Sequence, residues 1–194
     1  MRNAPIRRSG REDWASFIAL GDDDRRELVD GVLVEVDMPT KWHERVIAEL
    51  LFCLMVWAKK RGLVALPSGY KVKINNRRGA MPDIQVMTQA AYESADPQGL
   101  AGGRPEIVVE VISPGSRGHD RVRKLGWYAS IGVPEYWIVD MEARTLERCV
   151  LDEDVYSVRE TVLGDATFKP RGLRGLSIPM GDIWAALPAN GRKR

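Results

Sequence analysis

Two almost uninterrupted apolar runs constrain the fold more than any other feature of the chain. Residues 106–113 read EIVVEVIS and residues 135–140 read EYWIVD. Runs that are apolar on both faces are typical of strands inside a sheet that is covered on both sides. Residues 117–130 are predicted to form a helix between them, with Ser116 as its N-cap. Two buried strands joined by a helix predict a parallel strand–helix–strand unit over 106–140.

Shorter elements are predicted on either side of this unit. The segment RRELVDGVLVEVD at 25–37 predicts β-structure around Gly31, as a tight hairpin or as one strand with a bulge. Thr40 is predicted to cap a helix that glycine ends at Gly62. Further predicted elements are helices at 12–20 and 182–187, strands at 63–66, 70–74 and from Pro82 onward, a turn at 75–79, a polar loop at 92–104, and an antiparallel pair formed by TLERCVL and VYSVRETVL.

Together these elements predict a single α/β domain built on a mixed (α+β) sheet over residues 12–187. A basic N-terminal arm is predicted at 1–11 and a basic tail at 188–194.

Composition excludes several classes of protein. The 29 basic and 27 acidic residues leave a net charge of +2, so a histone-like protein is excluded. The sequence has no C-x-x-C, H-E-x-x-H, G-x-S-x-G, Walker A or G-x-G-x-x-G motif, which argues against zinc fingers, zincins, α/β-hydrolases and the commonest nucleotide-binding loops. Cys53 and Cys149 lie in apolar segments and are expected to be reduced core residues.

No targeting or membrane segment is predicted. The N-terminus lacks an apolar stretch of the secretory type, and the longest apolar run, 46–58, contains Glu49 and is too short to span a bilayer. We therefore expect a cytoplasmic protein without a membrane partner.

Glu110 is the most informative single residue. It lies within the first apolar run, where strand periodicity puts it on one face with Val108 and Ile112. A carboxylate buried in a strand costs several kcal/mol unless it is paired or binds a metal. The sequence leaves both readings open: a metal ligand, or a glutamate in a salt bridge at the end of the sheet.

Asp83 and Lys124 add to this pattern. Asp83 follows Pro82 at the start of a strand, and two carboxylates converging from adjacent strands suit Mg²⁺, with the backbone carbonyl of Val111 as a further ligand. Lys124 lies on the helix after the Glu110 strand and can reach back over its end, where a cation would stabilise a phosphodiester under attack. The alternative for Lys124 is a surface ion pair with Asp120.

These residues stand within segments that resemble a known family. The segments are PD at 82–83, EVISPGS at 110–116, lysine at 124 and YASIGVPEYWIVD at 128–140, together with the opening block RRELVDGVLVEV at 25–36 and His43. Over about residues 12–185 the chain resembles the Uma-type "putative restriction endonuclease" family of the PD-(D/E)XK nuclease superfamily.

The resemblance implies a restriction-endonuclease-like core, a central mixed sheet flanked by helices, and an Mg²⁺-dependent endonuclease that hydrolyses phosphodiester bonds of DNA. It implies Asp83 and Glu110 as catalytic metal ligands, with Mn²⁺ as a substitute ion. The lysine expected two positions after the glutamate is Ile112 here, and the resemblance implies Lys124 as its replacement.

Four further residues match the family or adjoin its motif. Glu27 and Glu35 correspond to acidic positions of the opening block, and either bind or support the metal or form exposed partners on a hairpin. His43 supports the site or contacts a phosphate, or is a partly buried helix histidine. Tyr128, four residues after Lys124, positions it or packs in the core.

Local positive charge suggests where DNA binds. Arg77 and Arg78 precede Asp83, and Arg117 and Arg121 lie near Lys124; these four are predicted to contact DNA, although solvated loop charges fit as well. Arg123 adds to the positive charge beside Lys124, but it is expected on another helix face and is predicted to be dispensable for cleavage. A homodimer is expected by analogy with two-fold-related nucleases.

Two other functions remain open from the sequence. A catalytically silent nuclease-like module could bind nucleic acid or protein, because a fold does not imply an activity. A hydrolase of another phosphate ester would use the same carboxylates and lysine without the arginines.

Overall fold

The computed structural model describes residues 10–21, 24–36, 38–112 and 119–188, except for the side chains of residues 119–121. Its helices are α1 (Trp14–Ile18), α2 (Lys41–Lys59), α3 (Gln89–Ser94), α4 (His119–Ser130) and α5 (Met180–Ala185). Its strands are β1 (Arg26–Val29), β2 (Val32–Glu35), β3 (Leu63–Pro67), β4 (Lys71–Asn75), β5 (Arg78–Ala80), β6 (Ile84–Thr88), β7 (Gly99–Leu100), β8 (Ile107–Ile112), β9 (Glu135–Asp140), β10 (Thr145–Asp152), β11 (Val155–Leu163), β12 (Thr167–Phe168) and β13 (Ile178–Pro179).

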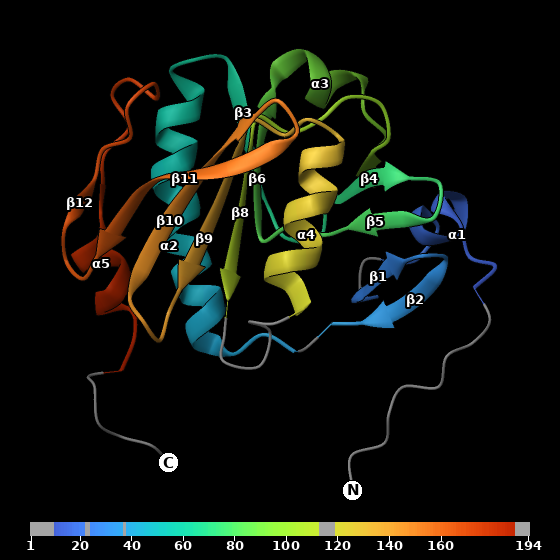
Figure 1. Cartoon of the computed structure of the whole chain (residues 1–194), viewed down its shortest axis with the longest axis horizontal. Coiled ribbons are helices and arrows are strands. Elements are labelled where there is room, and N and C mark those ends of the chain that lie inside the picture. Colours follow the sequence, from blue (N-terminus) through green and yellow to red (C-terminus); the bar gives the residue numbers. More distant parts are fainter. Residues whose placement is uncertain (1–9, 22–23, 37, 113–118, 189–194) are drawn as a thin grey trace, which may run out of the picture.

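A six-stranded mixed sheet forms the centre of the molecule, in the order β11-β10-β9-β8-β6-β3. The strands β8 and β9 run parallel, while the other neighbours in this sheet are antiparallel. In Figure 1, α4 lies in front of this sheet and α2 lies behind it. The predicted mixed sheet and its parallel strand–helix–strand unit are therefore confirmed.

The strand β8 divides its side chains between two apolar cores. Val109 and Val111 belong to the core shared with α2 and α5, whereas Val108 and Ile112 belong to the core shared with α4. All six residues of β8 are buried, because the strand lies between β9 and β6 and both of its faces are covered. The face predicted for Glu110 is thus the face that α4 covers.

A second, smaller sheet has the order β2-β1-β5-β4-β7 and contributes Val72 and Ile74 of β4 to the core under α4. The strands β1 and β2 form the predicted hairpin, in which Asp30 and Gly31 both have positive φ angles of 51° and 78°. Positive φ at both central residues is the requirement of a tight two-residue hairpin turn. The hairpin reading is therefore confirmed, and the bulged single strand is wrong.

Helix α2 begins as predicted. The Thr40 side chain accepts a hydrogen bond from the backbone N–H of His43 at 3.2 Å, so Thr40 is the N-cap. This cap fixes the first turn of α2, and with it His43. The cap predicted for α4 at Ser116 lies outside the described residues.

Two loop predictions were partly wrong. The loop predicted at 92–104 overlaps the end of α3 and contains β7. Helix α3 begins at Gln89 because the Thr88 side chain caps it, accepting a hydrogen bond from the Ala91 N–H at 3.1 Å. The turn predicted at 75–79 ends earlier than expected, since Arg78 already pairs with β4. Cys53 and Cys149 are free thiols, as predicted.

The contact between α1 and the second sheet depends on the absence of a side chain at Gly79. A Cβ atom there would lie 2.6 Å from the Phe17 ring. We predict that Gly79→Ala lowers the free energy of unfolding by about 1–3 kcal/mol, as expected for overpacking a core contact. Thermal unfolding measures this, at about 2–4 °C per kcal/mol for a chain of this size.

Gly102→Ala is the matched control, because nothing lies within 4 Å of a Cβ atom at that position. It should melt close to wild type. If Gly79→Ala also melts like wild type, α1 does not pack against β5 in this way.

Candidate active site

Asp83 and Glu110 lie on neighbouring strands of the central sheet. The strands β6 and β8 are antiparallel, with Ile84 opposite Val109. The residues one step further along, Asp83 and Glu110, therefore come opposite each other where β6 begins. The convergence of two carboxylates expected from the sequence is present at the backbone level.

Lys124 of α4 is buried between two carboxylates. Its Nζ lies 3.1 Å from Oε2 of Glu110 on β8 and 3.0 Å from Oε1 of Glu27 on β1. All three side chains are almost inaccessible to solvent: Lys124 is 5% exposed, Glu110 7% and Glu27 2%. The cluster joins both sheets to the helix between them, so Lys124 is not a surface residue; the side chain of Asp120, its alternative partner, lies outside the described residues.

Burial governs the protonation of Glu110. It raises the pKa of the Glu110 carboxyl to about 8; Lys124 partly opposes this rise, and the nearby charges of Asp83 and Glu27 add to it. The Tyr128 hydroxyl donates to Oε1 of Glu110 at 2.7 Å. Burial, with the charge of Glu110, raises the pKa of Tyr128 well above its usual value, so the phenol remains a donor.

Asp83 and His43 form a second group around the end of β8. The carboxylate Oδ2 of Asp83 accepts the backbone N–H of Val111 at 2.7 Å. The His43 Nε2 lies 2.8 Å from the Val111 carbonyl oxygen and 3.5 Å from Oδ2 of Asp83. Burial lowers the pKa of His43, but the hydrogen bond and charge of Asp83 and the Val111 carbonyl outweigh it and raise that pKa overall.

These contacts refine the roles predicted from the sequence. Glu27 joins the cluster, but Glu35 does not: it is exposed on β2 opposite Arg26. Strand alternation explains the difference, because Arg26 and Glu35 lie on the face of the hairpin opposite to Glu27. Tyr128 packs in the core, which was one of the two alternatives for it, and its hydroxyl donates to the Glu110 carboxyl.

The position of Ile112 explains why the lysine is elsewhere. Ile112 is only 3% exposed and lies in the apolar core under α4. A lysine there would carry its charge into this core, at a high desolvation cost. Lys124 instead reaches the carboxylates from α4.

The arginines predicted to bind DNA are only partly described. Arg77 donates to the carbonyl oxygens of Gly10 and Asp30, both at 2.9 Å, and Arg78 pairs with the Asp30 carboxylate at 2.6 Å. Arg117 and the side chain of Arg121 lie outside the described residues. DNA contact by these four arginines stays a prediction.

Arg123 lies beside Lys124, as expected, but its contact with Glu27 was not predicted. Its guanidinium lies 3.8 Å from Oε2 of Glu27, the carboxylate that also binds Lys124. That Arg123 is dispensable for cleavage stays a prediction. The sequence carried no signal for this contact, because it depends on how β1 packs against α4.

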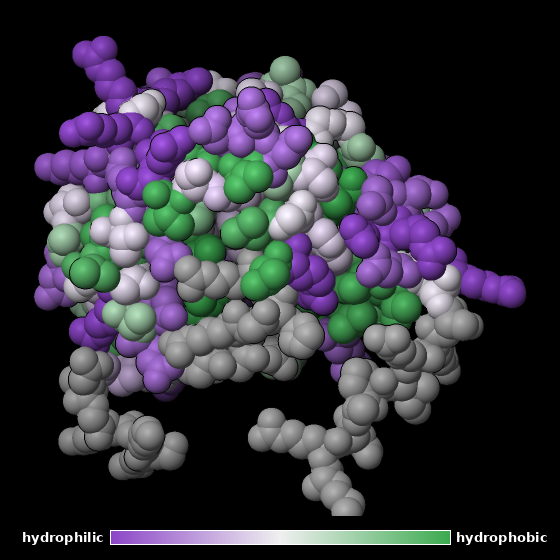
Figure 2. Space-filling view, viewed as in Figure 1, coloured by the Kyte–Doolittle hydropathy of each residue, from purple (hydrophilic) through white to green (hydrophobic). Residues whose placement is uncertain are grey.

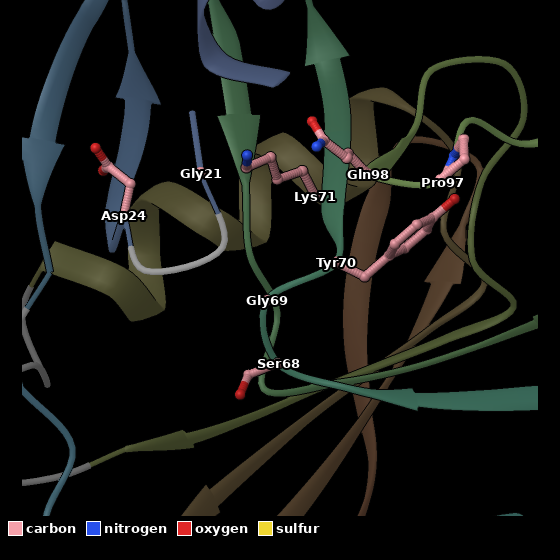
Figure 3. Close-up of a pocket in the computed structure, with 8 residues that line it drawn as sticks. All are labelled: Gly21, Asp24, Ser68, Gly69, Tyr70, Lys71, Pro97 and Gln98. Atoms are coloured by element: carbon pink, nitrogen blue, oxygen red, sulfur yellow. The ribbon is translucent and has the colours of Figure 1, made fainter. Parts of the chain in front are cut away.

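A cavity of about 320 Å³ lies away from this cluster (Figure 3). It is lined by residues 68–71 and 97–98 with Gly21 and Asp24, and by none of the predicted site residues. The buried Lys71 at its wall donates to the Leu20 carbonyl at 2.9 Å and stabilises the chain after α1. The cavity therefore does not extend the candidate site.

The fold and the cluster define a restriction-endonuclease-like α/β protein: a mixed central sheet, helices on both faces, and acidic residues from two adjacent strands. The sequence profile of the Uma2 family, described as "Putative restriction endonuclease", matches residues 12–181. The chain belongs to this family, as its sequence motifs predicted.

A solved structure supports the same fold. The crystal structure of a "putative nuclease belonging to DUF820" from Anabaena variabilis ATCC 29413 is 16% identical and superposes with a TM-score of 0.70. The match covers 89% of this chain and 97% of that chain. No curated protein gives a significant match. None of the helices in the described ranges is long and apolar enough to cross a bilayer.

We predict that Glu110→Gln stabilises the metal-free protein at alkaline pH. The pKa of Glu110 is about 8 in the folded protein and near the ordinary 4.5 in the unfolded chain. Between these values the folded protein binds the extra proton, so wild-type stability falls as the pH rises. The glutamine keeps an acceptor for Tyr128 and leaves Lys124 its pair with Glu27.

Melting temperatures in EDTA at pH 4.5 and pH 9 test this prediction. The variant should match wild type at pH 4.5 and exceed it by several degrees at pH 9, given about 2–4 °C per kcal/mol. A large loss of stability at pH 9 would mean that the Glu110 charge serves the fold.

Proposed function

We propose that the protein is an Mg²⁺-dependent endonuclease that hydrolyses phosphodiester bonds of DNA in the cytoplasm. The observation that carries the proposal is the buried cluster of Lys124 between Glu27 and Glu110, beside Asp83 on the next strand. Buried charges of this kind are costly, and hydrophobic residues of similar volume often stabilise a fold as well or better. Membership of the family, and the similarity in fold to a protein described as a "putative nuclease", support the same activity.

The donor set suits a hard divalent cation. Asp83 and Glu110 supply carboxylate oxygens and Val111 a carbonyl oxygen, the ligands that Mg²⁺ prefers. Within the described part of the chain, no group of three acidic, histidine or cysteine side chains is assembled to hold a metal. Water would therefore complete the coordination, as is usual for Mg²⁺, and the ion would polarise the phosphodiester. Mn²⁺ should substitute for it.

Side chains around the two carboxylates have separate tasks in this proposal. Glu27, whose Oε1 lies 3.0 Å from Lys124 Nζ, would keep Lys124 in place if Oε2 of Glu110 were to bind the metal ion. Lys124 then orients the attacking water and stabilises the charge that develops on the phosphate. Tyr128 restrains the other oxygen of Glu110, and His43 restrains Val111 and Asp83.

The homodimer is also part of the proposal, by analogy with nucleases that place one site on each DNA strand. Helix α2 exposes Phe52, Met55 and Val56, which supply an apolar surface for a second copy.

We predict that Asp83→Asn abolishes Mg²⁺-dependent cleavage of supercoiled plasmid DNA. Asparagine keeps the acceptor for the Val111 N–H, so the fold should survive, but it removes a charged ligand.

We also predict that Lys124→Met slows cleavage by roughly 10²- to 10³-fold, as for loss of one transition-state charge stabiliser. Its affinity for Mn²⁺, measured by calorimetry, should stay near that of wild type or rise slightly.

Lys124→Met leaves Glu27 and Glu110 without the cation that they share and should lower stability. Its cleavage rate is therefore measured below its melting temperature. The double variant Glu27→Gln/Lys124→Met, which also removes the charge of Glu27, is measured beside it. Lys60→Ala, an exposed lysine at the end of α2, is the control and should cut normally. Wild-type cleavage by Asp83→Asn contradicts the proposal. DNA binding by wild type without any cleavage would favour the silent binding module.

A further inference from the structure

Two arginines lie over one tryptophan beside the candidate site. The guanidinium carbons of Arg78, on β5, and Arg123, on α4, lie 5.9 Å and 5.2 Å from the centre of the Trp127 ring. Trp127 is 6% exposed and belongs to the core under α4. A rigid aromatic ring thus supports two cationic groups that come from elements far apart in the sequence.

The pair adjoins the residue proposed to act on the phosphate. Glu27 contacts Lys124 through Oε1 and Arg123 through Oε2, at 3.0 Å and 3.8 Å. The two cations therefore lie on opposite oxygens of one carboxylate. Any phosphate that reaches Lys124 brings the neighbouring part of the same backbone close to Arg123.

Both arginines are accessible at the surface. The side chain of Arg78 is 40% exposed and that of Arg123 is 28% exposed. Arg78 pairs with Asp30, whose side chain is 65% exposed, and such solvated ion pairs contribute little. Figure 2 shows hydrophilic side chains gathered over the part of the surface formed by β4 and β5. A phosphate can therefore displace the Asp30 contact at low cost.

The chemistry of the pair favours a phosphodiester backbone as its ligand. A guanidinium is a planar fork of donors that matches phosphate geometry, and stacking on an aromatic ring limits the freedom it loses on binding. Both groups lie over the Trp127 ring, Glu27 also contacts Arg123, and Asp30 pairs with Arg78, so the freedom of the two arginines is restricted before the ligand arrives. A chain of regularly spaced phosphates meets two fixed cations better than a single small anion does.

We propose that Arg78 and Arg123 form a phosphate-binding subsite on Trp127 that positions the DNA backbone next to the scissile phosphodiester. The inference rests on the proposed function, since it takes Lys124 as the residue at the reacting phosphate. Arg78 and Arg123 are positioning residues and act on the affinity for DNA rather than on the chemical step.

Equilibrium binding of labelled double-stranded DNA in EDTA tests the subsite without cleavage. Arg78→Ala and Arg123→Ala should each weaken binding several-fold, and each should reduce the slope of log K against log salt by about 1. The double variant should reduce the slope by about 2. The loss should be equal on two duplexes of unrelated sequence, because phosphates carry no sequence information.

Cleavage kinetics separate positioning from chemistry. At saturating DNA both single variants should keep kcat within a few-fold of wild type while KM rises. Arg123→Lys should recover the salt slope, since its charge remains. Arg159→Ala is the matched control: Arg159 forms an equally exposed pair with Asp152 on β11, at 3.1 Å. It should bind and cut like wild type.

The outcomes distinguish the subsite from the proposed function. If both alanine variants bind DNA with the affinity and salt slope of wild type, and wild type cleaves DNA, the subsite is overturned and the proposed function is not. If the alanine variants change the salt slope of DNA binding but the wild-type protein never cleaves DNA, the subsite is supported and the proposed nuclease function is overturned. Absence of DNA binding by wild type overturns both.

Discussion

The site depends on one buried lysine that two carboxylates share. Lys124 contacts Glu27 on the small sheet and Glu110 on the large sheet, and its own helix lies between them. Losing one partner of a buried ion pair typically costs about 3–5 kcal/mol, because a charge is left uncompensated. Lys124 keeps one carboxylate if the other binds a different cation. A change at Glu110 should therefore cost the fold less stability than a change at Lys124.

This asymmetry connects stability with function. Burial and the nearby charges of Asp83 and Glu27 raise the pKa of Glu110, so its ionisation is unfavourable in the metal-free site. Among the described side chains, His43 approaches Asp83 and Lys124 approaches Glu110. A divalent cation would compensate both acids at once. Such a site is one where binding a ligand stabilises the fold and where neutral substitutions raise stability at the expense of activity.

Much of the central sheet could be predicted because its signals are local. The apolar run around Glu110 fixes a strand buried on both faces, and Thr40 fixes the start of α2. The contacts of the site are not local. The contact between His43 and the Val111 carbonyl joins residues 68 positions apart. The contact of Arg123 with Glu27 depends on how the small sheet packs on α4, and no pattern in either segment specifies it.

The central claim is that Asp83 and Glu110 bind one divalent ion together. A crystal structure of the wild-type protein soaked in Mn²⁺, with anomalous data, tests it most directly. The account predicts one anomalous peak bounded by both carboxylates and the Val111 carbonyl oxygen, with Lys124 still paired to Glu27. A site without a peak at saturating Mn²⁺, or a peak held by other residues while Lys124 stays on Glu110, would contradict it.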